Sequence, residues 1–149
     1  KNNFKKLIKK KRFLEHAKVF DNYYGSSKNE VIKKLQKGKN VVFDIDWQGT
    51  RQIRNKNLNY KLLTIFILPP SKSELLKRLI KREKKNMKTV KKRMKGFKKD
   101  LSKWKEYDLV LVNDNLNDCY KKIMYAIKNI NEIRFDIKFI KKHVKRLLS

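Results

Sequence analysis

Three short apolar runs, each followed by a stretch with helical spacing, constrain the fold of this chain more than any other feature. The runs cover Val41 to Asp46, Leu62 to Leu68, and Leu109 to Val112. Strands that are apolar along their whole length are typical of parallel sheets that are buried on both faces. Because helical patterns separate the runs, we predict an α/β fold with a parallel sheet and helices on both faces.

The carboxyl ends of the predicted strands indicate where a ligand would bind, since ligands of open parallel sheets lie beyond these ends. The polar residues at the three ends are Asp44 and Asp46, Ser71 after Pro69-Pro70, and Asn113 with Asp114. Carboxylates after a strand, such as Asp44 and Asp46, can hold Mg²⁺ or its water ligands in nucleotide-binding folds. Alternatively, Asp46 caps a helix that begins at Trp47.

The remaining pattern is mostly helical, with an extended segment from Phe13 to Phe20. A capping box, Ser27 to Glu30, opens a helix that ends near Gln36, and Gly38 suits the left-handed position after it. Lys84 to Lys88 shows no periodic pattern. The other predicted helices are a short basic one with Phe4, Leu7 and Ile8 on one face, Trp47 to Lys56, one from Ser71 or Ser73 to about Arg82, Thr89 to Trp104, Asp118 to Ile130, and about Glu132 to Leu148.

Length and composition are those of a globular domain. The chain has 149 residues, of which 40% are hydrophobic, so it can build one core. The single cysteine, Cys119, excludes an internal disulfide, and His16 and His143 lie far apart for a zinc site. No apolar run approaches the roughly 20 residues of a membrane span, and no signal peptide is visible. These features predict a cytoplasmic protein without a membrane partner.

The net charge of +28 suggests polyanionic partners such as nucleic acid or nucleotide phosphates. Lysines are spread over almost every segment, however, which is the pattern of a compositional bias on solvated faces. The chain also lacks the signatures of common RNA- or DNA-binding modules. We therefore expect no specific nucleic-acid partner, and an RNA-binding protein is the least favoured hypothesis.

Glu15 and the segment after it could recognise a purine. A carboxylate accepts two parallel hydrogen bonds from guanine N1–H and its exocyclic amine, whereas N1 of adenine is an acceptor and would be rejected. Ser26 could donate to guanine O6, and Tyr24 to a phosphate oxygen. Taken singly, Glu15 is better explained as a solvated surface charge, and Tyr23 and Tyr24 as core or rim aromatic residues.

The sequence around these residues favours the purine-binding interpretation over the simpler one. The segments FLEHAKVF, NYYGSS, FDIDWQG, IFILPPS and VND resemble guanylate kinases in order and spacing, from about Phe4 to about Ile130. The resemblance implies a P-loop nucleoside-monophosphate-kinase core with a partial GMP-binding subdomain and a helical lid. It also implies transfer of the ATP γ-phosphate to GMP or dGMP, with Mg²⁺, in purine nucleotide metabolism.

The same resemblance assigns roles to individual residues. It places guanine on Glu15 and Ser26, the GMP phosphate on Tyr24, and Asp44 and Asp46 between base and metal, with Asp44 reaching Mg²⁺ through water. Lid arginines would act on the ATP phosphates as catalytic groups, and Asn113 would lie near the adenine. These arginines are Arg78, Arg82 and Arg93, the last two also binding ATP. The simpler interpretation is a solvated arginine at each position, and a turn or helix cap at Asn113.

The resemblance also predicts how the chain is divided. It indicates a single guanylate-kinase-like domain over residues 1–149. Residues 1–27 complete a GMP-binding subdomain, residues 28–77 and 105–131 form the core, residues 78–104 form the lid, and residues 132–149 form a basic C-terminal helix without an assigned role.

Several features depart from the family pattern. No G-x-x-x-x-G-K-[ST] occurs in these residues, so we expect that loop upstream of Lys1 and little activity from this chain alone. Asp21 stands where a glycine is usual, and Lys81 and Glu83 flank Arg82 where glycines are common. A catalytically inactive module that binds proteins or phosphopeptides is the alternative, although the set of retained site residues favours the enzyme. The sequence does not predict an oligomeric state.

Overall fold

The computed structural model describes residues 2–19 and 22–149 and divides into two compact units, Lys1–Leu62 and Leu63–Ser149. Phe20, the predicted end of the first extended segment, and Asp21 lie outside the described residues.

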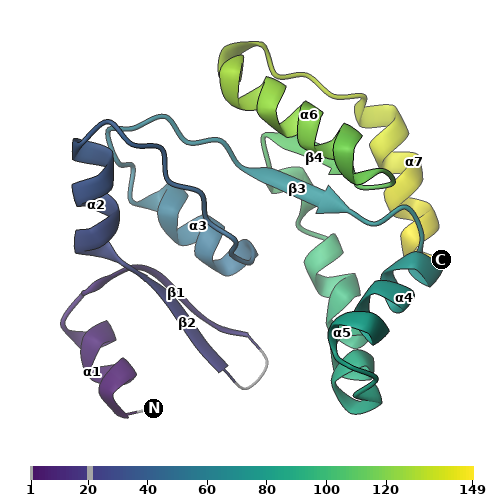
Figure 1. Ribbon diagram of the computed structural model, residues 1–149, viewed down its shortest axis with the longest axis horizontal. Coiled ribbons are helices and arrows are strands. Elements are labelled where there is room, and N and C mark those ends of the chain that lie inside the picture. Colours follow the sequence, from purple (N-terminus) through teal and green to yellow (C-terminus); the bar gives the residue numbers. More distant parts are fainter. Residues whose placement is uncertain (1, 20–21) are drawn as a thin grey trace. The chain divides into compact units, whose positions relative to one another are not determined.

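The first unit is built around a β-hairpin (Figure 1). Its elements are α1 (Asn2–Lys9), β1 (Phe13–Val19), β2 (Asn22–Ser27), α2 (Lys28–Gln36) and α3 (Trp47–Asn55). β1 and β2 are antiparallel with Glu15 opposite Ser26, and the register shifts between Phe13 and Glu15. At this irregularity the neighbours Leu14 and Glu15 are both buried, although strict alternation along a strand would point them to opposite faces.

The core of the first unit forms where the helices cover the hairpin. Leu14, Val31 and Ile53 form its buried centre, contributed by β1, α2 and α3. The Ser27 half of the predicted capping box is confirmed, since its hydroxyl accepts a hydrogen bond from the Glu30 amide at 3.5 Å, and Gly38 has the predicted positive φ of 69°. The chain therefore enters and leaves α2 as its sequence indicates.

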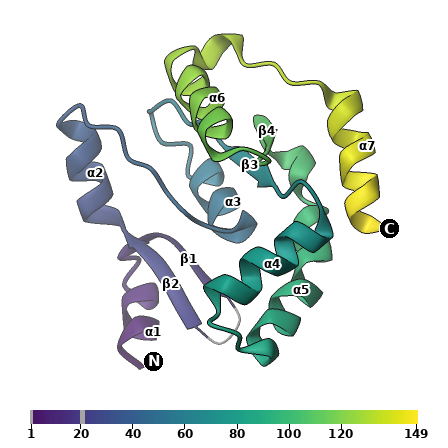
Figure 2. The same cartoon turned by 45° about the vertical axis from the view of Figure 1, so that its right-hand side comes forward.

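The second unit contains a two-stranded parallel sheet with helices on both faces (Figure 2). β3 (Ile65–Leu68) pairs with β4 (Leu109–Val112), with Ile65 opposite Leu109. Figure 2 shows α4 and α5 as a pair of adjacent helices. The remaining elements are α4 (Lys72–Arg82), α5 (Met87–Leu101), the 3₁₀ turn η1 (Trp104–Glu106), α6 (Leu116–Lys128), the 3₁₀ turn η2 (Ile130–Glu132) and α7 (Ile137–Leu148).

Alternate residues of β4 enter two different hydrophobic clusters, which confirms that both faces of the sheet are covered. Val110 packs with Leu101 and with residues of α7 such as Val144. Leu109 and Leu111 pack on the other side with α6. The predicted α/β class and parallel sheet are confirmed for these two strands.

A polar contact joins the residues directly before β3 and β4. The Asp108 carboxylate accepts hydrogen bonds from the Thr64 amide at 2.8 Å and from its hydroxyl at 2.6 Å. Thr64 is buried, so this carboxylate satisfies groups that would otherwise be costly to desolvate. The contact fixes where the two strands begin and so where their carboxyl ends lie.

Two predictions about elements were wrong. Residues 41–46 form no strand, because no segment of the described residues pairs with them, and Val42 is 87% exposed. The last helix begins at Ile137 rather than near Glu132, because Asp136 caps it by accepting from the Phe139 amide. The predicted helix from Thr89 is α5, which already starts at Met87 and ends at Leu101.

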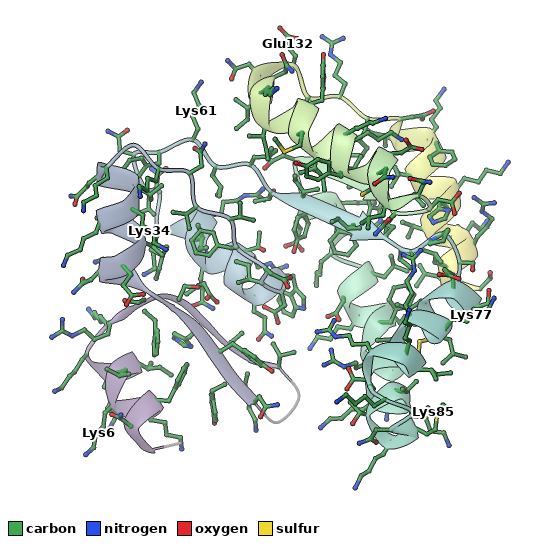
Figure 3. All side chains as sticks on the ribbon, in the orientation of Figure 1. Lys6, Lys34, Lys61, Lys77, Lys85 and Glu132 are labelled. Atoms are coloured by element: carbon green, nitrogen blue, oxygen red, sulfur yellow. The ribbon has the colours of Figure 1, made fainter. Side chains whose placement is uncertain are left out.

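Basic side chains are distributed over both units. Figure 3 labels Lys6, Lys34, Lys61, Lys77 and Lys85, and all five are exposed. Within the described part of the chain, no helix combines the length and apolar character needed to cross a bilayer.

Candidate functional site

Glu15 is the most unusual side chain of the first unit, because it is a carboxylate that is only 3% exposed. Ser26, opposite it in the hairpin, donates from Oγ to Glu15 Oε1 at 2.7 Å. The structure shows no donor to Oε2 from the described residues. Burying a carboxylate costs free energy unless donors satisfy it. One Glu15 oxygen is therefore held in place while the other remains able to accept a hydrogen bond from a ligand.

The first turn of α3 lies directly beside this carboxylate. Asp46 caps the helix, accepting from the amides of Gln48 at 3.0 Å and Gly49 at 3.1 Å. Gly49 is buried against Glu15, and a Cβ placed on it would lie 2.6 Å from Glu15 Oε2. The alternative interpretation of Asp46 as a helix cap is thus confirmed, whereas its contact with GMP stays a prediction.

Gln52 fixes α3 to the strand that carries Glu15. Its Oε1 accepts from the His16 amide at 3.1 Å, and its Nε2 donates to the His16 carbonyl at 2.7 Å. The Gln52 side chain thus pairs with both backbone groups of His16, as a neighbouring strand would. These two hydrogen bonds therefore help to fix the distance between α3 and Glu15, the residue next to His16.

Tyr24 shares a strand face with the Glu15–Ser26 pair. It lies two residues before Ser26 on β2, so both side chains point to the same side of the hairpin, and Tyr24 is 53% exposed. The structure thus brings Glu15, Tyr24 and Ser26 together on one face.

The two aspartates differ in how well they suit a metal ion. Both oxygens of Asp46 accept hydrogen bonds, Oδ2 from Gln48 Nε2 at 2.7 Å and Oδ1 from the first turn of α3. Asp44 is exposed, and the structure shows no intramolecular partner for it in the described residues. The described residues contain no cluster of three or more metal-ligating side chains. Mg²⁺ bound to nucleotides uses one or two carboxylates, waters and phosphate oxygens, so Asp44 fits an indirect metal contact and Asp46 fits less well.

In the second unit, Arg78 and Asn113 meet at the carboxyl ends of the two strands. Arg78 donates from Nη1 to the Asn113 carbonyl oxygen at 3.0 Å. Its Nε donates to Glu74 Oε1 at 2.8 Å, one helical turn away. Arg78 is therefore held by a contact with the residue directly after β4.

Arg82 and Arg93 share a single carboxylate. Arg93 Nε lies 2.8 Å from Glu83 Oε1, as an ion pair rather than a well-aligned hydrogen bond, and Arg82 Nε lies 3.9 Å from the same oxygen. The Arg82 side chain is 70% exposed and that of Arg93 is 27% exposed. Glu83, in the turn between α4 and α5, thus contacts two of the predicted lid arginines.

A cavity of about 960 Å³ lies elsewhere in the second unit, between β4, α6 and α7. Its wall includes Tyr125, Phe139 and His143, and also Asp114 after the end of β4, but none of the residues that the resemblance assigns to GMP or ATP. The cavity is therefore not assigned to the nucleotides.

Comparison with known proteins now identifies the family. Residues 1–130 match the family model described as guanylate kinase. The chain belongs to the guanylate kinase family. Curated relatives named guanylate kinase include those of Buchnera aphidicola, 48% identical over 127 residues (83% of this chain), and Ruegeria pomeroyi, 37% identical over 148 residues (99% of this chain). The chain spans 60% and 70% of the lengths of these two guanylate kinases.

A solved guanylate kinase from Anaplasma phagocytophilum has the same fold. It superposes with a TM-score of 0.72 and 24% sequence identity, over all of this chain and 72% of the solved one. The nucleoside-monophosphate-kinase fold predicted from the sequence is thereby confirmed, in part-length form.

Sequence reasoning missed three residues that contact the candidate site. Gly49 and Gln52 follow FDID on one helix, and only their distance to β1 reveals what they do. By sequence Glu83 is a departure from the family pattern, whereas the structure shows it pairing with Arg82 and Arg93, two of the predicted lid arginines. A glutamate between arginines of two adjacent helices is a signal that could have indicated this role.

Proposed function

We propose that this chain supplies the GMP-binding and lid parts of an ATP:GMP phosphotransferase. The reaction transfers the γ-phosphate of ATP to GMP or dGMP and yields ADP and the corresponding diphosphate. The buried Glu15 carboxylate, held on one oxygen by Ser26, is the observation that carries the proposal.

Guanine recognition follows from the chemistry of that carboxylate. Guanine presents N1–H and an amine on one edge, and both can donate to Glu15. Adenine presents an acceptor at N1, which would leave a buried carboxylate unpaired, and such a mismatch is strongly disfavoured. The Ser26 hydroxyl either orients the carboxylate, as the structure has it, or turns its proton toward guanine O6.

The phosphate of GMP would extend toward Tyr24. Its phenol lies on the same strand face as Ser26 and is exposed, so it can donate to a phosphate oxygen. Asp44 would orient waters of a Mg²⁺ ion. Such an ion would supply positive charge that neutralises the charge developing on the phosphates during transfer.

The lid supplies positive charge. Phosphoryl transfer is accelerated mainly by positioning and electrostatic stabilisation, which arginines near the transferring group provide. Arg78, Arg82 and Arg93 fit this role, and Asn113 fits a contact with the adenine of ATP. Arg82 is the candidate least fixed by contacts within the chain, because its 3.9 Å contact with Glu83 is long and its side chain is exposed.

Cradling the ATP phosphates requires a glycine-rich loop, and these 149 residues contain no G-x-x-x-x-G-K-[ST]. Activity is therefore proposed for a protein that carries this chain behind such a loop. A cytoplasmic setting is part of the proposal, supported by the single cysteine. No observation favours a phosphopeptide-binding module.

The proposal is tested by coupled measurement of ADP release on such a loop-bearing protein, with GMP, dGMP and AMP as acceptors. GMP and dGMP should turn over, and AMP should be slower by roughly 10⁴-fold in kcat/KM, the discrimination that buried polar groups achieve. Equal turnover of AMP and GMP would contradict a guanine-reading site.

A further inference from the structure

We propose that Gly49 is a positioning residue for guanine specificity: its missing side chain leaves the space that the Glu15 carboxylate occupies. The inference rests on the proposed function, since it concerns how Glu15 is placed to meet the base. Gly49 touches no ligand in this proposal and acts only through Glu15.

The geometry leaves no room for a side chain. A Cβ on Gly49 would lie 2.6 Å from Glu15 Oε2, and 3.3 Å from both Glu15 Cδ and Ile45 Cβ. Carbon and oxygen atoms in van der Waals contact stand well over 3 Å apart. Any residue other than glycine therefore displaces a neighbour.

The neighbour that yields is the carboxylate. The first turn of α3 is fixed by the Asp46 cap, and Gln52 fixes the helix to His16 at both its amide and carbonyl. The Glu15 carboxylate is the end of a flexible side chain and can rotate away. Such a rotation changes little in the fold, but it moves Oε2 and strains the 2.7 Å bond from Ser26.

Helix propensity alone predicts that replacing Gly49 by alanine stabilises the fold, in contrast to its expected effect on guanine recognition. Gly49 lies within α3 and its φ is not in the left-handed region, so the backbone does not require glycine there. Alanine is a much better helix former than glycine. An alanine at this position should thus preserve or raise stability while it lowers guanine recognition, a combination that a purely structural glycine would not give.

The test compares Gly49→Ala with Asn55→Ala, which makes the same new residue at an exposed position of the same helix. Affinities of this chain for GMP and for IMP are measured by calorimetry, and melting temperatures by circular dichroism. IMP lacks the exocyclic amine, so the GMP-to-IMP affinity ratio reports the second hydrogen bond to Glu15.

We expect the unchanged chain and Asn55→Ala to favour GMP over IMP by about 10-fold or more, the effect of one charge-assisted hydrogen bond. Gly49→Ala should melt at or above the original temperature while its ratio falls toward one. In a Glu15→Ala background, adding Gly49→Ala should leave GMP affinity unchanged, because the residue through which it acts is gone.

Three results would overturn the inference: an unchanged GMP-to-IMP ratio in Gly49→Ala, an unfolded Gly49→Ala chain, or a further loss of GMP affinity in the Glu15→Ala background. Failure of the proposed function looks different, since the unchanged chain would then bind GMP no more tightly than AMP.

Discussion

Glu15 is where the physical chemistry of single residues bears most directly on function. We predict that Glu15→Gln lowers GMP affinity by about 30-fold, or about 2 kcal/mol, because the amide keeps one acceptor and turns a donor toward a donor of the base. Calorimetric titration of this chain with GMP measures the change. Glu132→Gln is the matched control, since Glu132 is exposed and belongs to the other unit (Figure 3). Unchanged affinity in Glu15→Gln would mean that the carboxylate does not read the base.

Cys119 gives a second prediction at this scale. The thiol is 4% exposed, and burial raises its pKa, with the nearby Lys122 ammonium acting weakly in the opposite direction. Because the folded chain holds this proton more tightly than the unfolded chain, the contribution to stability is full below the unfolded pKa. It is lost as the pH rises through the higher folded pKa.

The measurement is urea unfolding from about pH 7 to about pH 10, around the ordinary thiol pKa. The decline in unfolding free energy should be shallower in Cys119→Ala, in which the titrating group is gone. Thiol-reactive dye should label native Cys119 far more slowly than the urea-unfolded chain. Equal labelling rates, or identical pH slopes in the two chains, would contradict a buried neutral thiol.

Some of these residues could be predicted from sequence and some could not. Glu15 and Ser26 were assigned from the resemblance, yet their direct bond depends on the register shift between Phe13 and Glu15. Gly49 and Gln52 lie more than 30 positions from their partners, and nothing local marks a glycine as a clearance for a distant carboxylate. Residue types therefore predicted chemistry, while tertiary distances were needed for positioning.

At the scale of elements, helix starts were the most predictable feature, because caps are local chemistry. The sequence left open whether Ser71 or Ser73 caps α4, and the structure assigns Ser71, which accepts from the Glu74 amide at 3.1 Å. We predict that Ser71→Ala lowers the unfolding free energy by about 1 kcal/mol, whereas Ser73→Ala stays within about 0.5 kcal/mol. Urea unfolding measures both. A larger loss from Ser73→Ala than from Ser71→Ala would reverse the assignment.

The turn between α4 and α5 carries a different prediction. Lys84 and Lys85 both have positive φ, 48° and 66°, which disfavours any residue other than glycine. Lys85→Gly should therefore raise the unfolding free energy by about 0.5–1 kcal/mol. The same change at Lys77, an exposed position inside α4, should lower it by about 1 kcal/mol. Destabilisation at both positions in urea unfolding would show that the left-handed turn is absent.

Strands were less predictable than helix caps, because a strand depends on its neighbours. The apolar run at residues 41–46 has the composition of a buried strand, but it pairs with nothing in the described residues and leaves Val42 exposed. β3 and β4 form where Asp108 joins them through Thr64. The start of α7 at Ile137 has a local cause instead, since the Asp136 side chain caps the helix there.

At the scale of the whole molecule, the net charge determines which kind of ligand the chain attracts. The net charge of +28 is spread over exposed lysines of both units, as the labelled ones in Figure 3 illustrate, rather than collected beside a base-reading surface. Such a field favours anionic ligands in general and selects none of them. Specificity must therefore come from buried groups, of which Glu15 is the one that we propose to meet the base.

The most direct test of the proposed GMP-recognising site, formed by Glu15, Tyr24 and Ser26, is binding of GMP and AMP to this chain, followed by calorimetry at physiological salt and by amide chemical shifts. GMP should bind in preference to AMP by about 100-fold or more, and it should shift the amides of Glu15, Ser26 and Gly49. Equal affinity for the two nucleotides, with shifts confined to surface lysines, would show that charge alone attracts them and would contradict the account.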